Sequence, residues 1–443
     1  MSDEPTLTEF ERTLDERAVG ILDACTACGA CVEVCPTPGV SSISTAPETV
    51  AAGVVDILRT GHGDSAAETW ASVCCGTGNC LTVCEHGINP RFMLLLARRA
   101  MKRDLPTLEK REAGKAEFKK MSRSAGIISR LQSPPDVLER LVPSSHPERD
   151  TPPDLIFYTG CNMPKTPHIG LLCLDVLDRL DVSYEVYGGP ANCCGVLQMR
   201  QGDIANGGRQ LDQTIKRYAA TRAPEVLSWC PTCQMQFEEP AATQAFDTAM
   251  FPVYLARRLD ELRPLLKTSV NKRVALCEFP GSTGVTESVV NLLSAIPGIE
   301  VVELELPPDV PRAGYTMFSL GPLPEFRKKL IAENMRAAER AGVNALVSVY
   351  HGDHRELAAH EGAWPFEFVN YMELLGASMG ISHDDSLKRL KLMRDVDLIM
   401  EAVADQIDAH NLDPDEVRDV IANDMLTEQL LPRDRSQHPG AKD

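Results

Sequence analysis

The chain has 443 residues, of which 43% are hydrophobic and 24% charged, and its formal net charge at pH 7 is −18. This acidic excess argues against a nucleic-acid partner, because affinity for a phosphate backbone rests on concentrated positive charge. The sequence has no apolar run near the roughly 18 residues of a membrane span, and its N-terminus lacks a basic stretch followed by an apolar core. We therefore expect no direct membrane span and a cytoplasmic protein that reaches the inner membrane only through a partner.

The 15 cysteines are many for a cytoplasmic chain. Thiols in a reducing compartment are kept for metals or redox chemistry, whereas structural disulfides belong to oxidising compartments. The chain is also too long for one ordinary core, so several domains are expected. The predicted segments are a helical two-cluster domain over 1–140, a linker over 141–153, an α/β half over 154–265, a second α/β half over 266–384 and an acidic helical extension over 385–443.

The first cysteine run follows a helix predicted from Leu7 to Asp23 and reads Cys25-Thr-Ala-Cys28-Gly-Ala-Cys31-Val-Glu-Val-Cys35-Pro36. Its spacing, C-x2-C-x2-C-x3-C-P, is the one associated with bacterial [4Fe–4S] clusters. Three thiolates on one tight loop reach the irons of one cube, and the fourth, Cys35, is directed to a second cube. A zinc site is the less consistent alternative, because zinc normally takes its four ligands from two separated pairs.

A second run comes after a helix predicted from Pro47 to Arg59 and reads Cys74-Cys75-Gly-Thr77-Gly-Asn-Cys80-Leu-Thr-Val-Cys84. The spacing of the first run would place a cysteine where Thr77 stands. With Cys84 completing the first cube, the second cube keeps the ligands Cys35, Cys74 and Cys80. Their C-x5-C-x3-C spacing resembles the [3Fe–4S] run of the succinate dehydrogenase iron–sulfur subunit, and we favour that cluster slightly. Cys75 is the alternative fourth ligand, which would preserve [4Fe–4S].

From Pro90 to Arg140 the pattern is helical, and the proline-rich segment after it predicts the linker. Beyond the linker, short apolar strands alternate with helices, which predicts two tandem α/β halves with mainly parallel sheets. The expected strands are Leu155–Tyr158, Tyr184–Tyr187, Val226–Trp229, Arg273–Leu276, Val301–Leu304 and Ala345–Val349. The expected helices between them are Ile169–Leu180 and Val285–Ala295.

More cysteines follow the strands of the first half. The carboxyl ends of parallel strands meet at one edge of a sheet, where ligands bind. We therefore expect one catalytic and metal-binding site, made by Cys161, Cys193, Cys194, Cys230 and Cys233. Structural thiols, or a C-x-x-C redox pair at Cys230 and Cys233, are simpler alternatives. Neither explains why Cys161 and a Cys-Cys-Gly accompany that pair.

The order C-x31-C-C-G-x34-C-x2-C resembles the cysteine-rich CCG domain found in the B-type subunit of heterodisulfide reductase. The resemblance implies a noncubane [4Fe–4S] cluster on the five cysteines. A ferredoxin-like module ahead of this domain is similar to the D-type subunit of heterodisulfide reductase, and to the iron–sulfur subunits of glycolate oxidase, anaerobic glycerol-3-phosphate dehydrogenase and thiol:fumarate reductase. The resemblance extends over roughly Asp23 to Asp384. It implies an α+β chain with a mainly helical ferredoxin-like domain, followed by two CCG-type α/β halves.

The second half departs from that pattern, because the cluster ligands are gone. Its corresponding segments are Cys277-Glu-Phe-Pro, Ala313-Gly-Tyr-Thr-Met-Phe318 and Ser348-Val-Tyr-His351-Gly-Asp353-His354. We expect this degenerate half to buttress the first. The polar group at 351–354 could bind a metal or shuttle protons, but the plainer expectation is a set of surface or loop residues. Cys173 is expected in the core, and Cys277 either in the core or as a vestige.

The resemblance leaves two main functions open, besides a scaffold or redox sensor that merely carries clusters. One is a redox enzyme subunit that passes electrons between the ferredoxin-type clusters and the cysteine-rich site, acting on a disulfide, thiol or sulfur-carrier substrate. The other is a pure electron-transfer subunit that links an FAD dehydrogenase or electron-transferring flavoprotein to a quinone or cytochrome. No G-x-G-x-x-G follows a predicted strand, so flavin or NAD would belong to a partner chain. Expected partners are therefore a flavoprotein or other redox subunits, with a membrane cytochrome, a quinone or a sulfur-carrier protein as further candidates.

Overall fold

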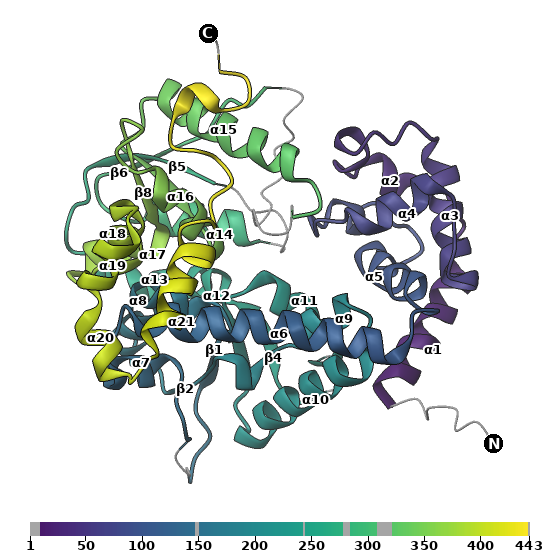
Figure 1. Ribbon diagram of the computed structural model, residues 1–443, viewed down its shortest axis with the longest axis horizontal. Coiled ribbons are helices and arrows are strands. Elements are labelled where there is room, and N and C mark those ends of the chain that lie inside the picture. Colours follow the sequence, from purple (N-terminus) through teal and green to yellow (C-terminus); the bar gives the residue numbers. More distant parts are fainter. Residues whose placement is uncertain (1–8, 147–149, 242–243, 278–283, 308–320, 442–443) are drawn as a thin grey trace. The chain divides into compact units, whose positions relative to one another are not determined.

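The computed structural model describes residues 9–146, 150–241, 244–277, 284–307 and 321–441 (Figure 1). The chain divides into two compact units. The first unit contains Met1–Lys120, Cys194–Thr214 and Ser319–Leu323, and the second contains Met121–Cys193, Ile215–Phe318 and Pro324–Asp443. The domain boundaries expected from the sequence stay predictions. None of the described helices has the length and apolarity needed to cross a membrane.

The first unit is built from helices in its described part. They are α1 (Glu9–Ala24), α2 (Ala30–Glu33), α3 (Pro47–Thr60), α4 (Ser65–Ser72), α5 (Pro90–Met101), α9 (Val196–Arg200) and the adjoining parts of α6 (Thr107–Arg130) and α10 (Ile204–Thr221). Asp64 caps α4 and Asn89 caps α5, because each side chain accepts backbone N–H groups of the first turn. Helix α3 buries Val50, Val54 and Ile57 at helical spacing. The helices predicted at 7–23 and 47–59 are thus present where the chain is described.

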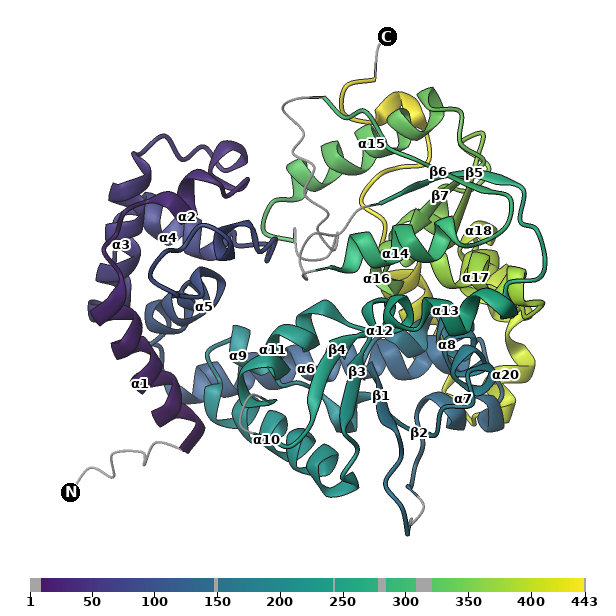
Figure 2. The ribbon, with the colours of Figure 1, turned by 180° about the vertical axis from the view of Figure 1, so that it is seen from behind.

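The second unit holds two parallel sheets with the same order of strands, which confirms the expected α/β class with parallel sheets (Figure 2). The first sheet has the order β2-β1-β3-β4, with β1 (Leu155–Gly160), β2 (Tyr184–Gly188), β3 (Glu225–Ser228) and β4 (Asp247–Met250). The second sheet has the order β6-β5-β7-β8, with β5 (Lys272–Leu276), β6 (Ile299–Val302), β7 (Ala345–Ser348) and β8 (Glu367–Asn370).

The helices of the second unit alternate with these strands. They are α7 (Pro135–Leu141), α8 (Pro167–Arg179), α11 (Pro231–Ala241), α12 (Phe251–Arg257), α13 (Leu259–Leu262), α14 (Val285–Ser294), α15 (Pro324–Arg340), α16 (His351–Leu357) and α17 (Tyr371–Met379). Strands β4 and β8 were not expected from the sequence. The edge strand β4, Asp247-Thr-Ala-Met250, has little apolar character, and only its last residue is buried. Strand β6 begins two residues before the expected position, directly after the turn at Gly298.

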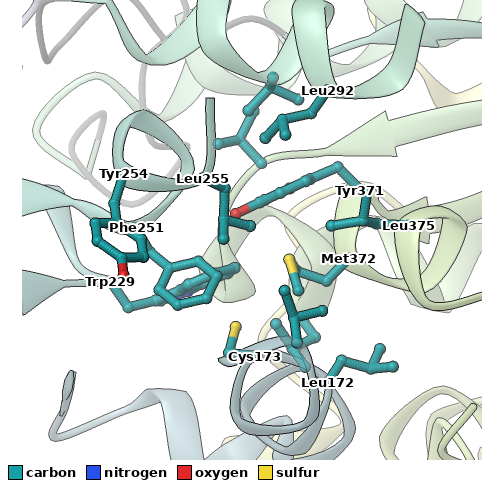
Figure 3. Close-up of a cluster of buried hydrophobic side chains, with 14 of the residues drawn as sticks. Leu172, Cys173, Trp229, Phe251, Tyr254, Leu255, Leu292, Tyr371, Met372 and Leu375 are labelled. Atoms are coloured by element: carbon teal, nitrogen blue, oxygen red, sulfur yellow. The ribbon is translucent and has the colours of Figure 1, made fainter. Parts of the chain in front are cut away.

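One apolar core is shared by the two sheets and contains residues of β3, α8, α12, α14 and α17 (Figure 3). Trp229 is fully buried in this core and stacks on Tyr371, with ring centroids 5.9 Å apart. Cys173 lies in the same core and is fully buried, as expected. Because Trp229 directly precedes Cys230, this packing fixes the end of β3 from which the cysteine pair begins.

The C-terminal extension is helical, as expected, and consists of α18 (Ser386–Met393), α19 (Val396–Ala402), α20 (Ala404–Ala409) and α21 (Pro414–Val420). Its apolar side chains form a cluster with Ile127, Ile128 and Leu131 at the end of α6, and Figure 1 shows α21 beside that helix. The extension is therefore part of the second unit's folded structure.

Candidate functional site

The ends of three neighbouring strands bring cysteines to one edge of the first sheet. Strand β1 pairs in parallel with both β2 and β3. Cys161 directly follows β1, Cys193 follows β2 after one short turn, and Cys230 comes two residues after β3. Parallel pairing gathers these carboxyl ends at a single edge.

Contacts among the sulfur atoms show that four of these cysteines lie together. The Cys161 thiol donates a hydrogen bond to Cys193, and this bond, together with burial and the charge of Cys230, raises the pKa of Cys161 well above its usual value. The Cys230 sulfur accepts hydrogen bonds from the Cys233 thiol and from backbone N–H groups at the start of α11, which lower its pKa to about 7 although burial acts against them. Cys193 and Cys233 are buried, whereas Cys161 and Cys230 are partly exposed.

Polar and cationic groups surround this cluster. Tyr158 Oη lies 3.7 Å from Cys233 Sγ, and Asn162 Nδ2 lies 3.4 Å from Cys161 Sγ, both as donors. Lys165 and Arg355 are buried within electrostatic range of Cys161. Burial, and the like charge of Arg355, hold the pKa of Lys165 well below its usual value. Negative charge on the sulfurs would stabilise both cations.

Steric constraints explain why the Cys-Cys-Gly motif ends in glycine. Gly195 has a φ of +75°, in the left-handed region that favours glycine, and it stands at the start of α9. A Cβ at this position would collide with the carbonyl oxygen of Gly207 in α10. The backbone directly after Cys193 and Cys194 can therefore adopt this conformation only with glycine at position 195. Cys194 itself is buried.

In the first unit, Cys84 lies with the first cysteine run. Burial, and the negative charges of Cys25, Cys28 and Cys84, raise the pKa of Cys31 to about 12. Gly29, with a φ of +81°, lets this loop approach the start of α3, because a Cβ there would lie 2.5 Å from the Glu48 nitrogen. The structure thus places one group of four thiols at Cys25, Cys28, Cys31 and Cys84.

A second group of thiols contains Cys35, Cys74, Cys75 and Cys80. Burial, and the charges of Cys74 and Cys35, raise the pKa of Cys80 to about 12 and raise that of Cys75 as well. The Thr77 backbone N–H donates to Cys75, so the loop turns an amide rather than a side chain toward this sulfur. The Trp70 indole N–H donates to Cys35 Sγ at 3.3 Å, and Thr37 Oγ1 lies 3.2 Å from the same sulfur.

The donor sets fit iron–sulfur clusters. Each group in the first unit offers four thiols within electrostatic range of one another, which is the ligand set of a cubane [4Fe–4S] cluster. The group at the sheet edge offers sulfur donors with amide, phenol and cationic neighbours. Hydrogen bonds to cluster sulfurs and nearby charges are features that set cluster potentials.

Comparisons with known proteins agree with this chemistry. The family model described as a 4Fe-4S dicluster domain matches residues 24–89, and the one described as a cysteine-rich domain matches residues 155–238. This is an iron–sulfur protein that resembles the D-type subunit of heterodisulfide reductase. That subunit of dihydromethanophenazine:CoB–CoM heterodisulfide reductase from Methanosarcina mazei is 25% identical to this chain over 319 residues. The counterparts from Methanosarcina acetivorans and Methanosarcina barkeri are each 24% identical, and every match covers 64% of this chain and 75% of the relative.

The dicluster match describes 4Fe-4S sites, so the [3Fe–4S] cluster that Thr77 suggested has no support. From the sequence, Thr77 stands where a ligand cysteine is expected, and Cys75 is the alternative fourth ligand. The structure places Cys75 near Cys35 and Cys74, so a fourth thiol is present in this group. Which cysteines bind iron stays a prediction.

One expectation for the second half is corrected, and one of the two alternatives for Cys277 is confirmed. His351, Asp353 and His354 are buried in α16, so the expectation of surface or loop residues was wrong. Cys277 is buried in an apolar core cluster. The segments 278–280 and 313–318, which correspond in the sequence to ligand positions of the first half, lie outside the described residues.

Sequence reasoning also missed Lys165 and Arg355 as neighbours of the cysteine-rich site. Lys165 follows Cys161 by four residues, and this spacing was a usable signal. Arg355 comes from the second half, about two hundred residues along the chain. Only the tertiary structure brings it within electrostatic range of Cys161.

The geometry at Gly195 makes a prediction about stability. Gly195→Ala should lower the free energy of unfolding by roughly 2–4 kcal/mol, because the new Cβ meets a backbone carbonyl in addition to the strain of a positive φ. The control is Gly380→Ala, where φ is +71° and no atom of the described residues lies within 4 Å of the added Cβ, so a loss of about 1 kcal/mol is expected. Denaturant unfolding under anaerobic conditions measures both. Equal losses would contradict the steric role of Gly195.

Proposed function

We propose that this chain is the iron–sulfur redox subunit of a heterodisulfide reductase-like complex, with its substrate site at the carboxyl edge of the first sheet. The observation that carries the proposal is the meeting of Cys161, Cys193, Cys230 and Cys233 at that edge, where parallel strand ends gather four cysteines beside the buried Lys165 and Arg355. Four sulfur donors at one sheet edge suit the binding of a cluster.

The cysteine groups support an assignment of ligands. Cys25, Cys28, Cys31 and Cys84 would hold one [4Fe–4S] cluster, and Cys35, Cys74, Cys75 and Cys80 a second. The group at the sheet edge would hold a noncubane [4Fe–4S] cluster together with Cys194, which the motif places next to Cys193. When bound, such clusters accept and release single electrons.

The side chains around the sheet edge favour an anionic sulfur substrate. Arg355 places buried positive charge within range of Cys161, where a thiolate would be stabilised, and a thiolate there would in turn favour the charged form of Lys165. The relatives are named for the CoB–CoM heterodisulfide. For this chain we propose a disulfide or a sulfur-carrier thiol. Reductive cleavage of a disulfide breaks one S–S bond, takes up two electrons and two protons, and gives two thiols.

The electrons would come from a partner redox protein. The sequence holds no dinucleotide fingerprint, so a flavoprotein or another redox subunit would supply them, and a membrane cytochrome is a further candidate. The many free cysteines favour the cytoplasm as the compartment. The relatives are subunits of a larger reductase, which supports an assembly with other redox subunits.

The double variant Cys193→Ser/Cys194→Ser tests the substrate site. It should lose about four irons per chain and abolish the oxidation of reduced viologen by disulfides, while the first unit's clusters remain reducible by dithionite. The control is Cys173→Ala, a buried core cysteine, which should keep both iron and activity. The assay would use oxidised glutathione and the CoB–CoM heterodisulfide as acceptors.

Full disulfide reduction by the double variant would contradict the proposed substrate site. If the wild-type protein reduces no disulfide but passes electrons from a flavoprotein to a quinone, the chain is a pure electron-transfer subunit instead. The loss of both sets of clusters in a folded double variant would show that the cysteines share one site.

Cys75 and Thr77 provide a separate test of the second cluster. Cys75→Ser should remove about four irons and one [4Fe–4S] signal in electron paramagnetic resonance, because it deletes the fourth thiolate. Thr77→Ser is the matched control in the same loop and should leave the spectrum unchanged. A [3Fe–4S] signal in the oxidised wild type that survives Cys75→Ser would contradict the assignment of Cys75.

A further inference from the structure

Four metal-ligating side chains meet inside the second unit, apart from the cysteines. They are His168 in the first turn of α8, His354 in α16, Glu373 in α17 and Asp385, which caps α18. One ligand atom from each residue lies within 4.8 Å of the others. The two histidines are fully buried, and the carboxylates are largely buried.

His168 is the informative member of this group. Neither of its ring nitrogens has a hydrogen-bond partner among the described residues, although the side chain is buried. Its nearest ionic neighbour is Asp385, whose Oδ1 lies 3.6 Å from His168 Nδ1. A neutral imidazole with no hydrogen-bond partner offers the lone pair of one ring nitrogen to a metal. Leaving buried polar atoms without partners is destabilising, and a ligand in this place would remove that cost.

The other three side chains are already oriented. His354 Nε2 lies 2.7 Å from Asp385 Oδ2, and His354 Nδ1 lies 4.0 Å from Glu373 Oε2. Backbone N–H groups fix both carboxylates, since Asn370 donates to Glu373 and Lys388 donates to Asp385. Such hydrogen bonds behind the ligands are typical of metal sites.

The charges of the group also favour a divalent cation. Glu373 and Asp385 bring two carboxylates. The ammonium group of Lys388 lies 3.0 Å from Glu361 and 3.8 Å from Asp385, so Glu361 is its closer partner. With both imidazoles neutral, as metal binding requires, the two carboxylates carry a charge of minus two that a divalent cation would balance.

We propose that His168, His354, Glu373 and Asp385 bind one structural Zn²⁺ ion. Two imidazole nitrogens and two carboxylate oxygens make a closed set of four, which is the coordination number of structural zinc. Calcium and magnesium prefer oxygen ligands alone, and catalytic non-haem iron keeps open positions. The ion would join the first α/β half, through α8, to the second half and to the start of the C-terminal extension.

Metal analysis of the anaerobically purified full-length protein, grown with added zinc, tests this inference. Roughly one zinc per chain is expected besides the iron, and it should resist dialysis. Zinc K-edge absorption should show nitrogen or oxygen neighbours at about 2.0–2.1 Å and no sulfur at about 2.3 Å, which separates this site from zinc on the cysteines. This measurement needs no variant.

Two substitutions locate the ion. His168→Gln and Asp385→Asn should each reduce the zinc content about tenfold, because each removes one ligand, while the iron content stays unchanged. His360→Gln is the matched control, because His360 is equally buried and both of its ring nitrogens lack partners, yet it lies outside the group. Zinc-free wild-type protein, sulfur-only coordination, or full zinc in both folded variants would overturn the proposal. Because iron is counted separately, its failure would leave the proposed function untouched.

Discussion

Buried thiols that lie close together can lose their protons only where positive charge stabilises the resulting thiolates. Burial and neighbouring thiolates raise the pKa values of Cys31, Cys80 and Cys75, and a hydrogen bond to Cys193, burial and neighbouring thiolates do the same for Cys161. Iron offsets the cost of ionising these buried thiols, because a coordinating thiol is deprotonated outright. The two matched domains, both iron–sulfur in character, coincide with these groups of thiols.

The rest of the structure holds those sulfurs in place. In the second unit, parallel pairing around β1 brings the strand ends together, and Trp229 anchors β3 in the core directly before Cys230. In the first unit, Gly29 allows the first run to lie against α3, and the Trp70 indole donates to Cys35. The degenerate half lacks a cysteine group among its described residues, yet it supplies Arg355 to the neighbourhood of Cys161.

Sequence patterns predicted the parts of the fold that have strong local signals. The buried strands at 155, 184 and 226 are short apolar runs, so their positions could be read directly. The edge strand β4 has no such run and was missed. Spacing indicated that Cys84 joins the first cysteine run, but it could not decide between Cys75 and Thr77, because spacing does not show which groups a loop turns inward. The burial of His354 depends on α8 and α18, which are distant in sequence.

The central claim is that one chain carries three groups of cysteines that each hold a four-iron cluster. Iron and acid-labile sulfide, counted per chain in anaerobically purified protein together with its Mössbauer spectrum, test that claim most directly. The account predicts about twelve irons per chain, divided among two cubane clusters and one site of different electronic structure. A fully folded protein that contains no iron, or only zinc at its cysteines, would contradict it.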